Sequence, residues 1–279
     1  GMREEHLVII SPLEGSPAEA AGVKAGDRIL QINEESTQGI TLTEAVTKIR
    51  GEAGSAVTLT VLRESDDDPL DITITRGDIK LDSVKWEEKE PGIYYLRISR
   101  FGERTGEEWN SAIQAIRKRG NLQSLILDLR NNPGGVLNTS VDVASDFVRE
   151  GTIVIEKFAD GKEREFATTG SAQLADFPVV VLVNQGSASA SEILAAALRY
   201  HRNAQLVGRK TFGKGVIQDA RDLPDGSGLH ITVAEWLTPE GENIEGEGLE
   251  VDVKIEITEE DVKAERDTQL EKALELLGN

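Results

Sequence analysis

The 279-residue sequence contains no cysteine, and this absence removes several kinds of chemistry at once. Disulfide bonds, thiolate zinc sites and a cysteine nucleophile are all excluded. Histidine is scarce, with three residues, and no histidine–glutamate spacing typical of a catalytic zinc site occurs. Three consecutive aspartates, Asp66–Asp68, are interpreted as the solvated tip of a hairpin rather than as cation ligands. The sequence therefore predicts no metal site and no cofactor.

Basic residues and long hydrophobic runs are also in short supply. The chain has 31 Lys and Arg against 50 Asp and Glu, a net charge of -19 that would repel phosphate backbones and anionic lipids. Nucleic acid is therefore not an expected partner. Apolar runs such as Pro178–Val183 are too short to span a bilayer, so no membrane span is predicted in this chain. Gly1 ahead of Met2 looks like a cloning remnant, consistent with a natural chain that begins earlier and has lost an export signal.

The first part of the chain, residues 1–77, predicts a small, mostly β module. Strand-like runs alternate with Gly and Pro, and one clear helix begins at Thr41 and ends at Gly51. Thr41 and Glu44 have the spacing of a capping box. The apolar residues on one face of this helix are Leu42, Ala45, Val46 and Ile49.

A charged, weakly patterned stretch, residues 78–92, is predicted to link this module to a second domain. From Ile93 the sequence alternates between strand and helix patterns. The expected elements are strand 93–98, helix 105–118, strand 124–129, helix 137–149 and strand 179–183. Such alternation predicts an α/β core with a largely parallel sheet over residues 93–256. The remaining residues, 257–279, predict a polar C-terminal helix from about Glu259 to Leu277 at the periphery.

Two loops are expected at one edge of this sheet, because ligands and loops gather at the carboxyl ends of parallel strands. Strand 124–129 leads into Arg130–Gly135, and strand 179–183 leads into Asn184–Ser189. A glycine pair lets backbone N–H groups face a ligand, and a helix N-terminus adds partial positive charge. We name the N–H groups of Gly135 and Ala190 as the donors of an oxyanion hole at this edge.

Ser189 is the candidate nucleophile and Lys214, held between two glycines, is its candidate base. A lysine accepts a proton only when its amine is neutral, and the apolar neighbours Phe212 and Val216 favour the neutral form. Gln218 has an amide oxygen that can orient the amine without adding a charge.

Each of these motifs has a competing interpretation. Ser189 and Glu192 have the spacing of a helix N-cap box. Residues 208–214 fit the G-x-x-x-x-G-K pattern of an NTPase phosphate loop. However, Gly215 stands where that loop needs Ser or Thr, and residues 216–221 predict a strand instead of the required helix.

A histidine base is the other alternative. His201 lies about 12 residues along the helix that Ser189 opens, roughly 18 Å away, and so is poorly placed. His230 lies within an apolar strand-like run, where a structural histidine is the more common case.

At this point the motifs together resemble those of the carboxyl-terminal processing peptidases, or tail-specific proteases. The resemblance covers about Leu7 to Val253. The serine and lysine motifs are Ser187–Glu192 and Phe212–Gly215; the oxyanion segment is Leu127–Gly135; the PDZ motifs are Gly15–Ala18, Gly22 and Ala25–Asp27. The resemblance implies a small PDZ-like domain followed by an α/β peptidase core of the crotonase or ClpP type.

This resemblance implies a serine endopeptidase that cuts protein substrates near their C-termini. Ser189 would be the nucleophile, Lys214 the base and Gln218 its assistant. The PDZ domain would hold apolar C-terminal tails or gate the site, with Leu42, Ala45, Val46 and Ile49 beside a groove that accepts an extended peptide by strand addition. The family also implies an exported protein, in a periplasmic, extracytoplasmic or lumenal compartment, and leaves a homo-oligomer open.

The sequence departs from the family pattern at its start. The PDZ-like domain is expected to lack its first strand and its Gly-rich carboxylate-binding loop, since neither is found before Leu7. A noncatalytic peptide- or ligand-binding protein on the same fold is the alternative function, because a fold does not fix an activity. An NTPase is a weaker alternative.

Overall fold

The structure is a computed structural model that describes residues 2–3, 6–9, 12, 16–24, 26–63, 68–77, 82–222, 228–258, 260–261 and 264–278. The chain divides into two compact units, Gly1–Leu81 and Asp82–Asn279. Within the described ranges, no helix combines the length and the apolar character needed to cross a membrane. Some predicted features lie outside these ranges: Gly15 and Ala25 of the PDZ motifs, Asp66 and Asp67 of the aspartate run, and residues 78–81.

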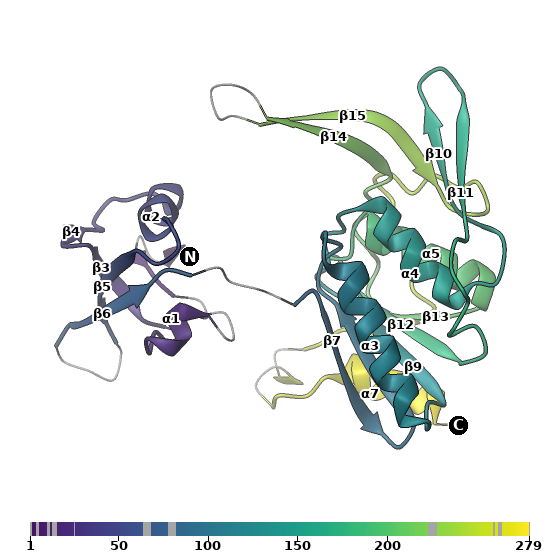
Figure 1. Cartoon of the computed structure of the whole chain (residues 1–279), viewed down its shortest axis with the longest axis horizontal. Coiled ribbons are helices and arrows are strands. Elements are labelled where there is room, and N and C mark those ends of the chain that lie inside the picture. Colours follow the sequence, from purple (N-terminus) through teal and green to yellow (C-terminus); the bar gives the residue numbers. More distant parts are fainter. Residues whose placement is uncertain are drawn as a thin grey trace. The chain divides into compact units, whose positions relative to one another are not determined.

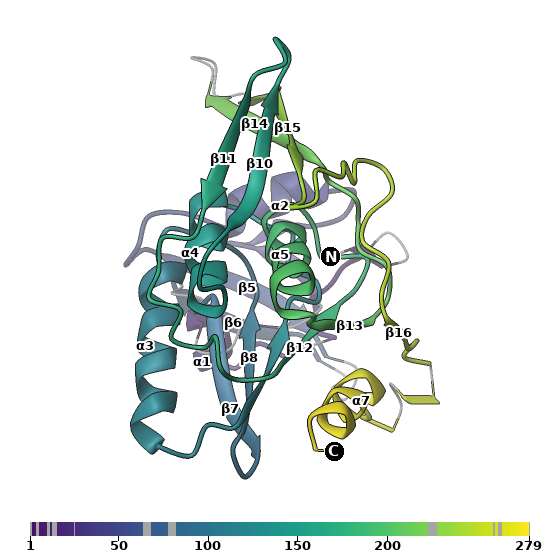
Figure 2. The same cartoon turned by 90° about the vertical axis from the view of Figure 1, so that its right-hand side faces the viewer.

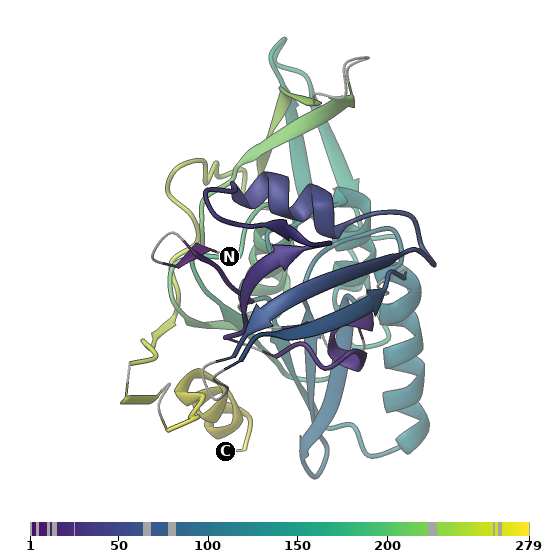
Figure 3. The ribbon, with the colours of Figure 1, turned by 90° about the vertical axis from the view of Figure 1, so that its left-hand side faces the viewer.

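The first unit is built on a four-stranded antiparallel sheet with the order β4-β3-β5-β6. Its strands are β4 (Glu35–Ser36), β3 (Arg28–Ile32), β5 (Ala56–Leu62) and β6 (Leu70–Thr75). A hairpin of β1 (Met2–Arg3) and β2 (His6–Leu7) and the helices α1 (Pro17–Ala20) and α2 (Leu42–Ile49) complete the unit. Apolar residues of β3, β5 and β6 form its core, and α2 packs along them through Ala45 (Figure 3).

Asp27 is a buried charge of the first unit. Its carboxylate accepts hydrogen bonds from Arg63 Nε (2.7 Å), Arg63 Nη2 (2.8 Å) and Lys24 N (2.8 Å). The bonds from Arg63, together with that from Lys24, lower the pKa of Asp27 below its ordinary value and outweigh the opposing effect of burial. The pair ties the turn before β3 to the residue that follows β5.

The second unit contains a six-stranded sheet with the order β16-β13-β12-β9-β8-β7 (Figure 1). These strands are β16 (Val253–Lys254), β13 (Gln205–Gly208), β12 (Val179–Val183), β9 (Ser124–Asp128), β8 (Ile93–Ile98) and β7 (Val84–Glu90). Every neighbouring pair is parallel except β7 and β8. The helices packed on this sheet are α3 (Thr105–Arg119), α4 (Leu137–Phe147), α5 (Ala190–Arg202) and α7 (Thr268–Leu277). The predicted α/β core with a largely parallel sheet is confirmed.

The two faces of the central strands are covered by different helices. Residues that join α3, α4 and α5 in one core include Leu125, Leu127, Val181 and Val183. Residues that pack with α7 on the opposite face include Ile126, Val180, Leu182 and Val207. Figure 2 shows α3, α4 and α5 together on one side of the strands, with α7 apart from them. Strands that are apolar at every position need such cover on both faces, because side chains alternate.

A second, antiparallel sheet with the order β11-β10-β15-β14 projects from the same unit as long hairpins (Figure 1). Its strands are β11 (Glu163–Ala167), β10 (Thr152–Phe158), β15 (Gly228–Leu237) and β14 (Val216–Asp222). β14 is an edge strand and begins two residues after Lys214. Lys214, the candidate base, therefore lies just before the first residue of β14 in the antiparallel sheet.

The structure corrects the prediction that residues 78–92 are a linker, because Val84–Glu90 forms β7 and pairs with β8. Only one face of β7 packs on the core, through Val84 and Trp86. Its exposed residues Lys85, Glu87 and Lys89 gave this stretch its charged character.

The C-terminal helix also differs from its prediction. It begins at Thr268, later than expected, and it is not peripheral: Gln269 and Ala273 are buried. Leu270 and Leu274 extend this buried stripe over the sheet. A polar composition concealed the stripe because only one face of the helix is covered.

We expect Asp27→Asn to destabilise the first unit by about 2 kcal/mol at neutral pH, because the amide cannot accept both Arg63 bonds. The folded pKa of Asp27 is lowered, so its stabilising contribution is complete above the unfolded pKa of about 3.9 and is lost as the pH falls through the folded pKa. Urea unfolding, followed by amide hydrogen exchange in β3 and β5, should show the difference between the two proteins shrinking as the pH falls below the unfolded pKa. A difference that stays constant with pH would contradict this.

Candidate active site

Ser189 occupies the turn between β12 and α5, at the carboxyl edge of the parallel sheet. Its backbone has φ 55° and ψ -116°, a conformation that is strained for a residue with a side chain. The helix caps Ser16 and Thr41 have extended backbones instead, with φ -78° and -79°. Serine nucleophiles are found at strained strand-to-helix turns of this kind, which expose the hydroxyl. A helix cap does not require a strained backbone, so capping alone does not account for the conformation of Ser189.

The loop that follows β9 lies directly against this turn. A Cβ at Gly134 would lie 2.7 Å from Ala188 O and 2.8 Å from Ser189 Cβ, and φ of Gly134 is +96°. A Cβ at Gly135 would lie 2.0 Å from Phe101 O, with φ +138°. Only glycine fits at either position: Gly134 lets the loop backbone approach the serine closely, and Gly135 lets it approach Phe101.

Gly135 and Ala190 each have a backbone N–H that donates to no other described residue. Gly135 forms a parallel bridge with Phe101, in which Phe101 N donates to Gly134 O and Val136 N donates to Phe101 O, both at 2.8 Å. This pattern turns the Gly135 N–H away from Phe101. Both predicted oxyanion donors thus remain available.

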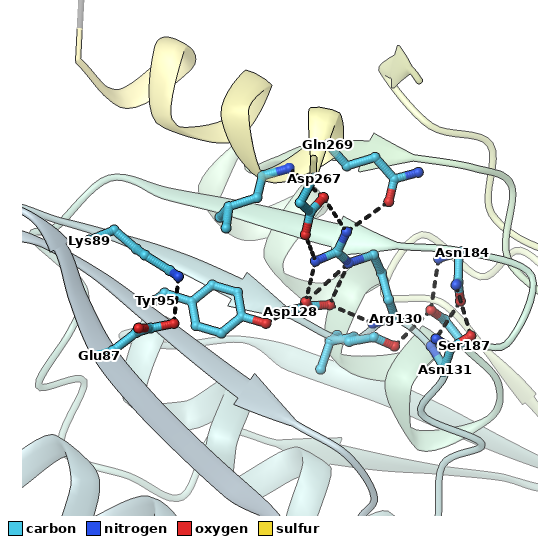
Figure 4. Close-up of polar contacts among 12 residues, drawn as sticks. Glu87, Lys89, Tyr95, Asp128, Arg130, Asn131, Asn184, Ser187, Asp267 and Gln269 are labelled. Atoms are coloured by element: carbon cyan, nitrogen blue, oxygen red, sulfur yellow. Dashed lines mark hydrogen bonds and ion pairs between the residues drawn. The ribbon is translucent and has the colours of Figure 1, made fainter. Parts of the chain in front are cut away.

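Several hydrogen bonds hold the two loops together. Asn132 O accepts from Ala188 N (3.0 Å) and from Ser191 Oγ (2.9 Å). Asn131 N donates to Asn184 Oδ1 (2.8 Å), and Asn184 Nδ2 donates back to Asn131 Oδ1 (2.9 Å) (Figure 4). The loops after β9 and β12 therefore meet at one edge, as the parallel pairing of these strands predicts.

Glu192 joins the serine turn to the lysine loop. Its side chain is fully buried. The donors to its carboxylate are Ser189 N (2.8 Å), Thr211 Oγ1 (2.5 Å), Gly213 N (2.7 Å) and Lys214 N (2.9 Å). A buried carboxylate needs such donors to offset its loss of water. One side chain therefore fixes the backbones of both candidate catalytic residues.

The backbone around Lys214 is held on all sides. Gly215 N donates to Glu245 Oε2 (2.6 Å), and Trp236 Nε1 donates to Lys214 O (2.7 Å). The three successive N–H groups of residues 213–215 thus all bind carboxylates. The Lys214 side chain itself is half-buried.

The structure does not join the side chains of the predicted catalytic residues. Among the described hydrogen bonds, none links Lys214 Nζ to Ser189 Oγ or to Gln218. Gln218 lies on β14 with its side chain exposed. The catalytic roles of these three residues stay predictions, as do the oxyanion roles of Gly135 and Ala190.

The phosphate-loop alternative is disfavoured by the same geometry. Lys214 is followed by β14 and not by a helix, and the N–H groups that would cradle a phosphate already bind Glu192 and Glu245. His201 is near the far end of α5, where its Nε2 contacts Thr152 O at 2.8 Å. The side chain of His230 lies outside the described residues.

The four residues predicted to bind substrate on α2 are placed differently from one another. Leu42 and Val46 are 45% and 36% exposed and can contact a peptide. Ala45 is fully buried, and Ile49 packs against the core of the first unit, so these two support the helix from within. The predicted lack of a first strand and a carboxylate-binding loop stays a prediction.

In the part of the chain that the structure describes, no group of three or more acidic or histidine side chains is arranged to hold a metal ion. The sequence identified Glu192 only as a cap partner of Ser189. Its bonds to Gly213 and Lys214 carried no sequence signal, because these residues lie more than twenty positions away.

Two family models match the chain. The model of peptidase family S41 matches residues 92–255, which is more than half of the chain, and that of the PDZ domain matches residues 8–63. The chain belongs to peptidase family S41. The predicted PDZ domain followed by a peptidase core is confirmed.

Relatives of this S41 chain include the carboxyl-terminal-processing protease of Synechocystis sp., 41% identical over 97% of this chain and 65% of the relative. The carboxy-terminal processing protease CtpA of Bacillus subtilis is 38% identical over 91% of this chain and 54% of the relative. The structure of a photosystem II D1 C-terminal processing protease is 31% identical, with a TM-score of 0.60 over 100% of this chain and 74% of that one. The chain spans about half to two-thirds of the length of these curated relatives.

We expect Glu192→Gln to lower the free energy of unfolding of the S41 unit by about 2 kcal/mol, because its amide directs a donor at N–H groups that need an acceptor. The melting temperature should fall by roughly 4–8 °C. Glu245→Gln is the matched control, since Glu245 is exposed and holds one N–H of the same loop; its effect should stay under about 1 kcal/mol. Equal effects of the two changes would contradict the role given to Glu192.

Proposed function

We propose that the protein is a serine endopeptidase in which Ser189 and Lys214 form the catalytic dyad. The observation that carries this proposal is the attachment of both residues to Glu192, with Ser189 at a strained turn that lies against Gly134. A helix cap or a binding loop has no need for this combination of strain, close glycine contact and paired backbones. The membership of family S41 supports the same reaction class.

In the proposed mechanism Ser189 Oγ attacks the carbonyl carbon of the scissile peptide bond while the neutral amine of Lys214 takes its proton. The oxyanion that forms accepts hydrogen bonds from Gly135 N and Ala190 N, each worth about 3–4 kcal/mol in such transition states. Lys214 then donates the proton to the leaving nitrogen, and the C–N bond breaks. Water hydrolyses the acyl-enzyme with the same amine as base.

Gln218 is proposed to orient the Lys214 amine by accepting a hydrogen bond from it. Catalytic hydrogen bonds are often formed only in the complex with substrate, so the lack of a described bond to either Ser189 or Gln218 is compatible with the unbound protein. Gln218 belongs to β14, the strand that begins two residues after Lys214 in the sequence.

The substrates are proposed to be proteins with apolar C-terminal tails. Large apolar side chains are exposed beside the site: Val136, which follows Gly135, is 44% exposed, and Phe212, two residues before Lys214, is 64% exposed. On the PDZ domain, Leu42 and Val46 offer a second apolar surface for a tail. Exposed apolar residues at these points favour an apolar peptide over a charged one.

Ser189→Ala and Lys214→Met should each lower kcat/KM for an unstructured protein with an apolar tail by at least about 10⁴-fold, because each removes one half of the dyad. Lys210→Met is the matched control, since Lys210 is a surface lysine paired with Glu250. Melting temperatures of all variants should be compared to exclude misfolding. Unchanged cleavage by Ser189→Ala would sink the proposal, and tight tail binding without any cleavage by the wild type would favour the noncatalytic alternative.

Phe212→Ser should raise KM for the apolar-tailed substrate by roughly tenfold and leave kcat within a factor of about two, because it removes apolar contact area but no catalytic group. The same substrate with a charged tail should be cleaved equally by both proteins. A loss confined to kcat would show that Phe212 acts on the lysine loop and not on the substrate.

A further inference from the structure

Arg130 lies two residues after β9, in the segment that leads to the glycine pair, and every N–H of its guanidinium group donates a hydrogen bond. Its Nε donates to both Asp128 oxygens at 3.0 Å, and its Nη2 donates to Asp128 Oδ2 at 2.6 Å. The remaining donors reach the C-terminal segment: Asp267 Oδ1 (2.8 Å), Asp267 Oδ2 (2.7 Å) and Gln269 Oε1 (3.0 Å). All five N–H groups that an arginine possesses therefore have acceptors. Figure 4 shows Arg130 between Asp128 and Asp267.

These partners come from the opposite end of the chain. Asp267 is 137 residues from Arg130 and is the N-cap of α7, where its carboxylate also accepts from Leu270 N. Gln269 is 2% exposed, and its Nε2 donates to Ile255 O at 2.8 Å. Burial by itself would raise the pKa of Asp267, but the hydrogen bonds that its carboxylate accepts from Arg130 and from the backbone N–H of Leu270 outweigh burial and lower this pKa, so Asp267 is charged at neutral pH.

Apolar contacts also attach α7 to the sheet. Ala273, Leu270 and Leu274 already bind α7 to the apolar face of the sheet opposite α5. The hydrogen bonds of Asp267 and Gln269 are made instead to Arg130, which lies at the edge of the sheet, two residues after the end of β9. A bidentate arginine–carboxylate pair fixes direction as well as distance.

The residues that follow Arg130 are also held by hydrogen bonds, up to the part of the loop that lies against Ser189. Asn131, the next residue, is bound to Asn184, and Asn132 is bound to Ala188 and to Ile98 O. Gly134 N donates to Asn132 Oδ1 at 2.9 Å. Arg130, Asn131, Asn132 and Gly134 are therefore each held by hydrogen bonds along the segment that leads to Gly135.

We propose that Asp267 and Gln269 are positioning residues of the active site: by holding Arg130 they set the place of the Gly135 N–H relative to Ser189. The C-terminal helix thereby becomes part of the catalytic apparatus although it lies on the opposite face of the sheet. The inference rests on the proposed peptidase function, because a displaced oxyanion donor matters only to a reaction that builds an oxyanion. Small displacements of catalytic groups have large effects on rate.

A graded series at Asp267 tests this. Asp, Asn and Ser are all good N-caps, so Asp267→Asn and Asp267→Ser keep the start of α7 while they weaken and then remove the contacts to Arg130. We expect kcat to fall by several-fold for Asp267→Asn and by about tenfold to a hundredfold for Asp267→Ser, with KM within a factor of about two. Lys272→Gln is the control, since Lys272 forms an exposed pair with Glu275 on the same helix.

The outcomes separate the two levels of the proposal. A lower melting temperature with unchanged kcat, measured well below the transition, would show that Asp267 only anchors the fold and would overturn the inference. A rise in KM with kcat unchanged would overturn it as well. If the wild-type chain and Ser189→Ala behave alike, the proposed peptidase function fails, whereas normal wild-type activity with an insensitive Asp267→Ser rejects only the positioning role.

Discussion

The buried carboxylate of Glu192 is the constraint on which the candidate active site depends. A carboxylate without water is unfavourable unless donors surround it, and this one collects donors from the first turn of α5 and from the lysine loop. Those segments are otherwise separated by the whole of α5 and by β13. Because each donor is a backbone N–H or a short hydroxyl, the two segments have little freedom to move relative to each other. The positions of Ser189 and Lys214 follow from this requirement.

The close approach of Gly134, together with Glu192, holds Ser189 in its strained conformation. Ser189 holds a strained backbone, and such strain persists only where surrounding contacts over-determine the conformation. Here the contacts are the bond to Glu192 and the close approach of Gly134. The parallel pairing of β9 with β12 brings the two loops to one edge, and Asn131 and Asn132 then fasten them together.

Elements with a strong local pattern could be predicted from the sequence. β12 coincides with its expected range, and α3 differs from its expected range by one residue, because long apolar runs and helical periodicity are properties of the segment itself. β7 and β11 could not be predicted, since many of their side chains are solvent-exposed and charged and pairing with a neighbouring strand helps to stabilise them. β10 has no prediction either, although Ile153 and Val154 lie in the core. β13 is only four residues long.

The sequence by itself determined the candidate catalytic residues and the family. A serine before a helix, a lysine between glycines and a glycine pair after a strand are local motifs that can be recognised in the sequence alone. Only the tertiary structure decided how they are connected. Glu192 serves the lysine loop as well as its own helix, and Asp267 reaches Arg130 across 137 residues. Spacing in the sequence carries no record of such partners, because packing of the sheet and its helices, and not local preference, brings them within hydrogen-bond distance.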